Sequence, residues 1–428
     1  MDTISITPRG PLDADVSLPG SKSITNRALV IAALAEGETA LRNWLRSEDT
    51  LVMIRCLRRL GFSIAGPDRV GDGAPLRIVG GGGRIPSPGA SLDAANSGTT
   101  IRFLAALVSL GRGRFTLDGN ERMRERPIGP LLDSLRALGV EARSVEGNGC
   151  PPVEIEARGL QGGECALAGD VSSQFLSALL LSGPGAGGDL LVRIEGELVS
   201  RPYVEMTIRM MADFGIEIER ASEKTFRVPA GRKYRGRDYL VEGDASSASY
   251  FWGAAAVAGG RVRVTNIGES SIQGDARFVE VLERMGAKIR RGEGWTEVEG
   301  PVVRGIDADL NDMPDLVPTL AVAALFVPGP TRIVNVANLR FKESDRIRAV
   351  ANEIRRIGGK ADELPDGIVV EGGRLRGAEI ETYRDHRIAM AFSLVGLKVP
   401  GIVIKDPGCV AKTFPTFFDL FLNLPPRD

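Results

Sequence analysis

Lysine and arginine stand next to runs of small hydroxyl residues at several places in the sequence. The first such place is Gly20–Arg27, where Lys22 and Arg27 flank Ser23 and Thr25. Guanidinium and ammonium groups bind phosphate and carboxylate, and a hydroxyl residue at a helix start either caps the helix or contacts an anion. The segment therefore predicts one wall of a site for a small substrate rich in phosphate and carboxylate. Other basic residues that could join this site are Arg102, Arg122, Arg124, Arg126, Lys342, Arg346, Arg384, Arg387 and Lys412.

Two carboxylates stand among these cations and could move protons. Asp315 follows Pro314 at a predicted helix start, and Glu343 lies between Lys342 and Arg346. Neighbouring cations favour the ionised form of a carboxylate, and acid–base catalysis needs such a group within reach of the substrate. Taken alone, each residue fits a structural salt bridge equally well.

A repeated pattern of elements positions these residues. Six segments open with small polar residues and run into an apolar helix that ends near Gly or Pro: 21–37, 96–111, 172–183, 244–259, 313–329 and 384–401. A strand is predicted after each helix, at 39–41, 114–117, 190–194, 261–264, 331–334 and 402–404. In most units a second helix follows, and it is predicted to end on a C-cap glycine, namely Gly61, Gly139, Gly215, Gly286 or Gly358. A further strand then resumes, as at 140–142 and 216–219.

Six such units favour two domains of three units each over one large doubly wound sheet, because extra strands occur at Gly-rich turns. We expect a mixed α/β (α+β) fold of repeated βαβαββ units with an active-site cleft between the domains. Domain 1 would comprise residues 1–20 and 241–428, and domain 2 residues 21–240. The tetraglycine Gly80–Gly83 opens no helix, so a dinucleotide fingerprint is unsupported and we interpret it as a flexible turn.

Composition excludes several classes of function. The chain has 428 residues with 54 Lys and Arg against 55 Asp and Glu, so a global basic field for nucleic acid is absent. One histidine makes a His-based metal site unfavourable. Four scattered cysteines without a C-x-x-C pair indicate free thiols in a reducing cytosol. No signal peptide and no membrane span is predicted.

Several motifs, taken together and in order from about Pro8 to Phe418, resemble those of the 5-enolpyruvylshikimate-3-phosphate synthase family. They are Pro19-Gly20-Ser21-Lys22-Ser23, Asn96-Ser97-Gly98-Thr99, Arg126-Pro127-Ile128-Gly129, Ser172-Ser173-Gln174, Arg201-Pro202-Tyr203, Glu242-Gly243-Asp244-Ala245-Ser246-Ser247-Ala248, Lys342-Glu343-Ser344-Asp345-Arg346 and Asp385-His386-Arg387. The resemblance implies a two-domain inverse αβ barrel with no cofactor and no metal. It also implies transfer of the enolpyruvyl group of phosphoenolpyruvate to the 5-hydroxyl of shikimate 3-phosphate, through a tetrahedral intermediate.

The resemblance also assigns residues to the two substrates. Those implied to bind shikimate 3-phosphate are Lys22, Ser23, Arg27, Ser172, Ser173, Gln174, Ser200, Tyr203, Asp315, Asn338 and Lys342. Those implied to bind phosphoenolpyruvate are Lys22, Asn96, Gly98, Arg126, Gln174, Arg346, Arg387 and Lys412. Asp315 would be the base at the 5-hydroxyl, Glu343 would exchange a proton with the methylene carbon, and Lys22 would touch both substrates. Gly98 would leave room for an anion, and with it for the inhibitor glyphosate.

Three other readings stay open. The related UDP-N-acetylglucosamine enolpyruvyl transferase typically has a cysteine where this chain has Glu121, and a Lys-Asn pair where it has Lys22-Ser23. An RNA-end-modifying cyclase of related architecture would need a nucleotide site and a catalytic histidine, for which His386 is available. A non-catalytic anion-binding protein would give no reason for Asp315 and Glu343. For the favoured reading we expect a cytoplasmic monomer that binds neither nucleic acid nor membrane, with hinges near Gly20 and Tyr239.

Overall fold

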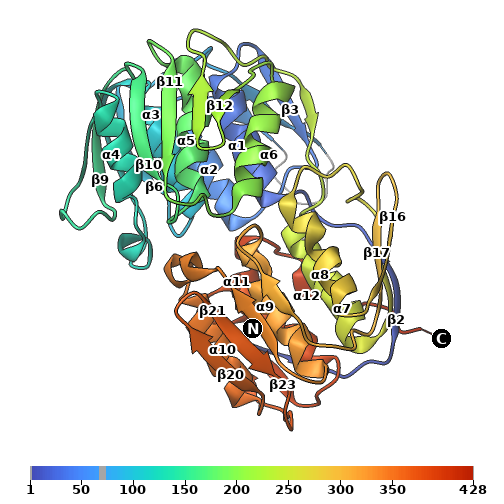
Figure 1. Ribbon diagram of the computed structural model, residues 1–428. Coiled ribbons are helices and arrows are strands. Elements are labelled where there is room, and N and C mark those ends of the chain that lie inside the picture. The colour runs from blue at the N-terminus through green and yellow to red at the C-terminus, as the bar shows by residue number, and fades with distance from the viewer. Residues whose placement is uncertain (1, 67–73, 428) are drawn as a thin grey trace. The chain divides into compact units, whose positions relative to one another are not determined.

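The computed structural model describes residues 2–66 and 74–427. The chain forms two compact units, one of Met1–Pro19 with Glu242–Asp428 and one of Gly20–Val241. We call them unit 1 and unit 2 (Figure 1). Each unit consists of sheets and helices in a repeated order, so the mixed α/β class expected from the sequence is confirmed.

Unit 2 contains three four-stranded sheets of one design. In each, a leading strand lies parallel to the next strand of the repeat, and a hairpin adds two antiparallel strands. The first repeat is α1 (Lys22–Leu34), β3 (Glu38–Arg42), α2 (Glu48–Arg59), β4 (Ser63–Ala65) and β5 (Leu76–Val79), led by β14 (Asp238–Leu240). The second is β6 (Gly89–Asp93), α3 (Gly98–Val108), β7 (Arg112–Asp118), α4 (Gly129–Ala137), β8 (Glu141–Ser144) and β9 (Val153–Arg158). The third is β10 (Gly163–Ala168), α5 (Ser173–Ser182), β11 (Leu190–Glu195), α6 (Arg201–Asp213), β12 (Glu219–Ser222) and β13 (Thr225–Val228).

Unit 1 repeats this design twice and then departs from it. The fourth repeat is β2 (Leu12–Val16), α7 (Ala245–Ala258), β15 (Gly260–Val264), α8 (Phe278–Arg284), β16 (Lys288–Arg291) and β17 (Thr296–Gly300). The fifth is β18 (Asp307–Asp309), α9 (Val317–Ala323), β19 (Thr331–Val334), α10 (Arg346–Arg356), β20 (Lys360–Leu364) and β21 (Gly367–Glu371). The sixth is β22 (Glu379–Ile380), α11 (His386–Gly396) and β23 (Ile402–Lys405), followed by α12 (Phe417–Phe421). Its hairpin is replaced by β1 (Thr3–Ile6), which pairs antiparallel with β23.

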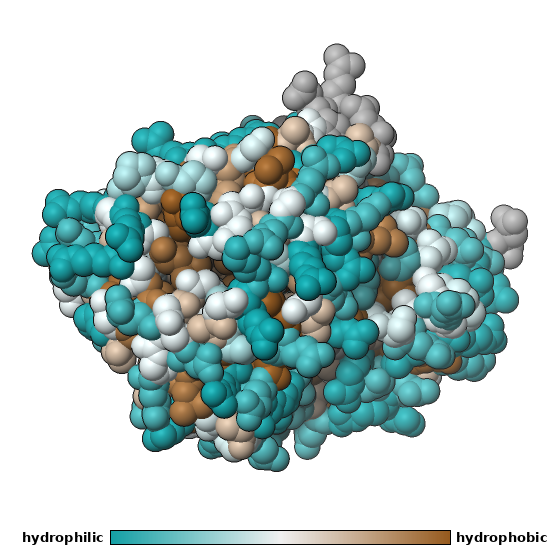
Figure 2. Space-filling model, turned by 90° about the horizontal axis from the view of Figure 1, so that it is seen from above, coloured by the Kyte–Doolittle hydropathy of each residue, from teal (hydrophilic) through white to brown (hydrophobic). Residues whose placement is uncertain are grey.

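The first helix of each repeat lies in the core of its unit. Helices α1, α3 and α5 pack against one another in unit 2, and α7, α9 and α11 do so in unit 1. Their residues are buried almost without interruption, which explains why these segments are apolar on all sides. The outward faces of the sheets carry ion pairs between neighbouring strands, and hydrophilic side chains dominate the face seen in Figure 2.

The expected element boundaries are largely found. All five predicted C-cap glycines have a positive φ, from +83° at Gly139 to +109° at Gly286. Glycine adopts this conformation without the penalty that a Cβ brings. The strand expected at 216–219 is wrong except at Glu219, because residues 216–218 belong to no strand and β12 begins at Glu219.

The tetraglycine includes a turn at Gly82 and Gly83, as predicted, but backbone hydrogen bonds hold it, so its description as flexible is corrected. The four N–H groups of Gly80–Gly83 donate to the carbonyls of Gly37, Ala33, Ala35 and Leu34 at 2.8–3.0 Å. These carbonyls stand at the C-terminal end of α1, where a helix leaves its own acceptors unpaired. A Cβ at Gly80 would meet the Ala35 carbonyl oxygen at 2.1 Å, so the glycines bring one backbone against another.

Candidate active site

Every residue that the sequence assigns to a substrate lies in one of two clusters, each inside one unit. The unit 2 cluster comprises Lys22, Ser23, Arg27, Asn96, Gly98, Arg126, Ser172, Ser173, Gln174, Ser200 and Tyr203. The unit 1 cluster comprises Asp315, Asn338, Lys342, Glu343, Arg346, Arg387 and Lys412. Both clusters lie at helix starts and in the loops beside them.

In five of the six repeated helices the residue before the helix caps it. Side-chain oxygens of Ser21, Ser97, Ser172, Asp244 and Asp385 accept from N–H groups of the first helical turn. The capping interpretation of these residues is therefore correct. The fifth repeat differs, because a 3₁₀ turn at Pro314–Leu316 precedes α9.

Arg27 is a buried cation held by neutral groups. Its guanidinium donates to the Thr207 hydroxyl at 2.7 Å and to the carbonyls of Ser23 and Tyr203 at 3.0 and 3.1 Å. Burial lowers the pKa of Arg27 to about 10, which leaves the side chain charged at neutral pH. Among the ion pairs of residues 2–66 and 74–427, none includes Arg27, so its charge is free to attract a substrate anion.

Arg102 joins two segments of the unit 2 cluster, and the sequence assigned it no substrate. Its guanidinium donates to Gln174 Oε1 at 2.7 Å, to the Ser172 hydroxyl at 3.3 Å and to the Pro127 carbonyl at 3.1 Å. Gln174 in turn donates to the Thr99 hydroxyl at 3.1 Å. Its place two residues after the Asn96–Thr100 run was the one signal that it belongs to the cluster.

Gly98 makes room for Arg126. A Cβ at position 98 would lie 2.6 Å from Arg126 Nη2 and 2.9 Å from its Cζ. The Arg126 guanidinium also donates to the Asn96 carbonyl at 3.3 Å, and the side chain is 4% exposed. The glycine therefore leaves space for the Arg126 guanidinium, and this cation would in turn bind an anion.

Lys22, Ser200 and Tyr203 complete the unit 2 cluster. Lys22 opens α1 and its ammonium lies 3.5 Å from Asp49 Oδ2. Ser200 is buried and has φ +55° directly before α6. Tyr203 lies on the first turn of α6, where its carbonyl accepts from Arg27. The starts of α1 and α6 thus meet at Arg27.

In unit 1, Asp315 lies between two arginines. Its Oδ1 accepts from Arg346 Nη1 at 2.8 Å, and its Oδ2 accepts from Arg387 Nη2 at 2.7 Å. Lys342 Nζ is 3.9 Å from Oδ1. Both oxygens of the carboxylate thus contact an arginine, and its side chain is 18% exposed.

Glu343 occupies a similar place beside it. Its Oε2 accepts from Arg346 Nη2 at 2.7 Å, and Lys412 Nζ stands 4.0 Å from its Oε1. Asn338 lies nearby in the chain with a buried Oδ1 that has no hydrogen-bond partner among the described residues. A buried amide oxygen without a partner costs free energy, and a substrate hydroxyl would remove this cost.

Arg346 contacts three carboxylates, those of Asp315 and Glu343 and that of Asp385, which we add to the unit 1 cluster. Asp385, quoted in a motif but given no role, accepts from its Nε at 2.8 Å and from its Nη2 at 3.2 Å. Burial alone would lower the pKa of Arg346, but Asp385, Glu343 and Asp315 together raise it above its ordinary value. Four cations, counting Arg387, Lys342 and Lys412, face three carboxylates, so the cluster keeps a net charge of +1.

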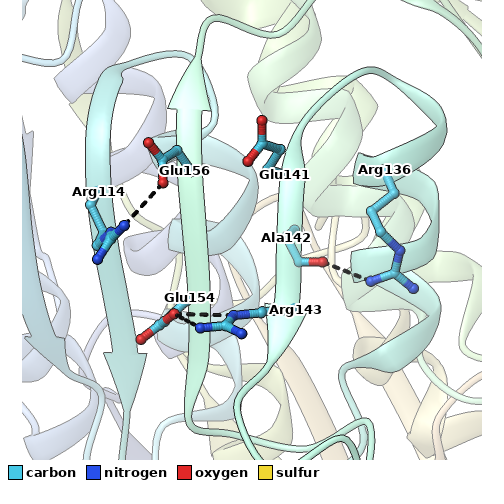
Figure 3. Close-up of a pocket in the computed structure, with 7 residues that line it drawn as sticks. All are labelled: Arg114, Arg136, Glu141, Ala142, Arg143, Glu154 and Glu156. Carbon is cyan, nitrogen blue, oxygen red and sulfur yellow. Dashed lines mark hydrogen bonds and ion pairs between the residues drawn. The ribbon is translucent and has the colours of Figure 1, made fainter.

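Other polar groups do not join the clusters. His386 is fully buried beside Asp385, with Nδ1 3.6 Å from Oδ1. A groove on the outer face of β7, β8 and β9 is lined by paired charges, such as Arg143 with Glu154 at 2.6 Å (Figure 3). No set of three metal-ligating side chains occurs within the described part of the chain, and none of its helices is long and apolar enough to span a bilayer.

Comparisons with known proteins identify the family of the chain. Residues 6–421 match the sequence model of EPSP synthase (3-phosphoshikimate 1-carboxyvinyltransferase). The chain is 49% identical over 426 residues to the 3-phosphoshikimate 1-carboxyvinyltransferase of Nostoc punctiforme, with 99% of each chain covered, and 45% identical over 423 residues to that of a Marinomonas species, with 98% and 99% covered. A solved structure of EPSP synthase from Acinetobacter baumannii superposes with a TM-score of 0.82 at 30% identity, covering 99% of this chain and 98% of that one. The chain belongs to the EPSP synthase family.

Proposed function

We propose that this chain transfers the enolpyruvyl group of phosphoenolpyruvate to the 5-hydroxyl of shikimate 3-phosphate, and that both clusters act on this one pair of substrates. The observation that carries the proposal is the pair of carboxylates, Asp315 and Glu343, held 2.8 and 2.7 Å from the same buried arginine, Arg346. Cations alone would bind anions, whereas two anchored carboxylates beside them can also move protons.

Membership of the family implies which residues of the two clusters bind which substrate. Arg27, with no carboxylate partner among the described residues, would bind shikimate 3-phosphate together with Ser23, Ser172, Ser173, Gln174, Ser200, Tyr203, Asn338 and Lys342. Arg126, Arg346 and Arg387 would bind phosphoenolpyruvate together with Asn96, Gly98, Gln174 and Lys412. Lys22 would touch both substrates. Guanidinium groups suit these anions because two N–H donors match two oxygens.

The chemistry then divides into addition and elimination. In the addition, Asp315 takes the proton of the 5-hydroxyl as its oxygen bonds to the central carbon of phosphoenolpyruvate, and Glu343, after taking up a proton from solvent, gives that proton to the methylene carbon. In the elimination, Glu343 takes a proton back from the methyl group, the carbon–oxygen bond to phosphate breaks, and the proton held by Asp315 passes to the departing phosphate, so that Asp315 is ionised again. The products are 5-enolpyruvylshikimate 3-phosphate and phosphate. Fixed cations stabilise the charge that collects on the leaving group.

The alternative is enolpyruvyl transfer to UDP-N-acetylglucosamine. Glu121, at the position where that enzyme typically has a cysteine, is exposed, and Ser23 stands where that enzyme has asparagine. A phosphate-release assay with each acceptor in turn separates the two. We expect release with shikimate 3-phosphate and none with the nucleotide sugar, and the opposite result would overturn the proposal.

The proposal also includes a cytoplasmic monomer that works without metal or cofactor. Light scattering after size exclusion should give the mass of one chain. Treatment with EDTA followed by desalting should leave the rate of phosphate release unchanged, since Arg and Lys side chains supply all the positive charge that the two clusters need. A rate restored only by added metal would contradict this part of the proposal.

A further inference from the structure

Helix α10 holds the segment that leads into α11 at two points. Arg346 opens α10 and Glu353 follows seven residues later, so both lie on one face, about two helical turns apart. Both are buried, with 1% and 0% exposure. Arg346 binds the Asp385 side chain. Glu353 accepts from the Tyr383 hydroxyl at 2.8 Å and from the Glu381 N–H at 3.1 Å.

The segment between these two points has a strained backbone. Tyr383 and Arg384 have φ values of +55° and +54°, a region that residues with a Cβ rarely adopt. Such a conformation persists only where its surroundings hold it. The two bonds to Glu353, together with the bond from the Asp385 N–H to the Thr382 carbonyl at 2.8 Å, hold it here.

Asp385 transmits the position of this segment to the unit 1 cluster. Its carboxylate caps α11 through the Arg387 N–H at 3.0 Å and fixes Arg346 through two bonds. Arg346 and Arg387 are the two arginines on either side of Asp315. A shift of the segment would therefore move both guanidinium groups.

We propose that Glu353 and Tyr383 are positioning residues that hold Arg346 and Arg387 in the orientation that binds phosphoenolpyruvate. The inference rests on the proposed function, because it takes these arginines as the ligands of that substrate. The charge of Glu353 is balanced by Arg356, whose Nε lies 2.9 Å from Glu353 Oε2. Tyr383 donates as a neutral phenol, and burial raises its pKa, so the contact persists at neutral pH.

The test is Tyr383→Phe, which removes the hydroxyl and keeps the ring. We expect the KM for phosphoenolpyruvate to rise roughly 5- to 20-fold, as for a lost hydrogen bond to a charged group, with the KM for shikimate 3-phosphate unchanged and kcat nearly so. Glu353→Gln keeps one acceptor oxygen and should raise the same KM. Adding Arg384→Gly to Tyr383→Phe should restore part of the affinity, because glycine accepts the left-handed conformation.

The matched control is Tyr234→Phe, which removes a buried phenol bonded to the Leu181 carbonyl at 3.0 Å in unit 2. It should lower the unfolding temperature and leave both KM values as they are. If Tyr383→Phe behaves like this control, the contact is structural and the inference fails. Titration calorimetry of phosphoenolpyruvate gives the same comparison without turnover. If the wild-type enzyme shows no turnover, the proposed function fails. The calorimetric comparison of Tyr383→Phe with Tyr234→Phe would then still test whether Tyr383 is needed for binding of phosphoenolpyruvate.

Discussion

At the scale of single residues, the two clusters differ in how their charges are balanced. Arg27 has only neutral partners among the described residues, whereas Arg346 has three carboxylates. Arg27 thus offers its full charge to a ligand. Arg346 and Arg387 in unit 1 form ion pairs with carboxylates, and these ion pairs hold the carboxylates in place.

Asp315→Asn tests the base at the 5-hydroxyl. The amide keeps the shape of the side chain but cannot accept a proton, so kcat should fall roughly 100- to 10,000-fold. The charge of the unit 1 cluster rises from +1 to +2, so calorimetry should still detect binding of shikimate 3-phosphate. The matched control is Glu371→Gln, which removes an exposed carboxylate 3.2 Å from Lys360 and should leave kcat unchanged. Normal turnover in Asp315→Asn would refute the assignment.

Gly98→Ala tests the space reserved for Arg126. Because the added methyl would come within 2.6 Å of the guanidinium, Arg126 must move. A displacement of this size should raise the KM for phosphoenolpyruvate roughly 10-fold or more and weaken inhibition by glyphosate in parallel. The KM for shikimate 3-phosphate should change little. Gly294→Ala, where nothing lies within 4 Å of the new Cβ, is the control. Equal KM values for the two variants would count against this reading.

The sequence predicted which residue types gather, but not how they pair. Lys342, Glu343 and Arg346 are close in the chain, so their grouping could be predicted. Asp385 was given no role, and Arg102 was named as a possible site cation without a partner, because their partners Arg346 and Gln174 lie far away in the sequence. Side chains that act through distant partners carry no local spacing signal.

At the scale of elements, the helix starts and the C-cap glycines could be predicted from the local sequence pattern. A C-cap glycine is required by the left-handed conformation of a single residue. The five predicted C-cap glycines could therefore be recognised from the residues next to them in the sequence. The tetraglycine was misjudged because its acceptors, the last carbonyls of α1, lie more than forty residues earlier in the chain. The helix and strand of the sixth repeat were predicted, but the pairing of β23 with β1 was not, because β1 comes from the other end of the chain.

Gly80→Ala tests the packing of the tetraglycine on α1. A methyl 2.1 Å from one carbonyl oxygen and 2.6 Å from another must push two backbone segments apart. We expect the free energy of unfolding to fall by about 1–3 kcal/mol, the usual cost of overpacking, as measured by urea unfolding followed by circular dichroism. Gly10→Ala, with open space around its Cβ, should unfold like the wild type. An unchanged midpoint of urea unfolding for Gly80→Ala would show that the tetraglycine can move to make room for the methyl group, which would contradict this prediction.

At the scale of the whole molecule, the chain crosses between its units twice, at residues 19–20 and 241–242. We propose that the units are domains that move as bodies about these two crossings when shikimate 3-phosphate binds. Small-angle scattering should give different profiles for the free and the liganded enzyme. Arg27→Ala, which lacks the buried cation, should keep the profile of the free enzyme at the same ligand concentration. Identical profiles for the free and liganded wild type would contradict the proposal.

The pairing of β1 with β23 also has a consequence for synthesis on the ribosome. Gly20–Val241 holds every strand of its own three sheets, including β14, which completes the sheet of β3. Unit 2 can therefore fold while the rest of the chain is still being made. Strands β1 and β2 emerge before it, yet they must wait for β23 and β15, a delay of tens of seconds at about 5–20 residues per second. During that time the backbone N–H and C=O groups of β1 and β2 lack their partners in the folded protein and could pair with other chains.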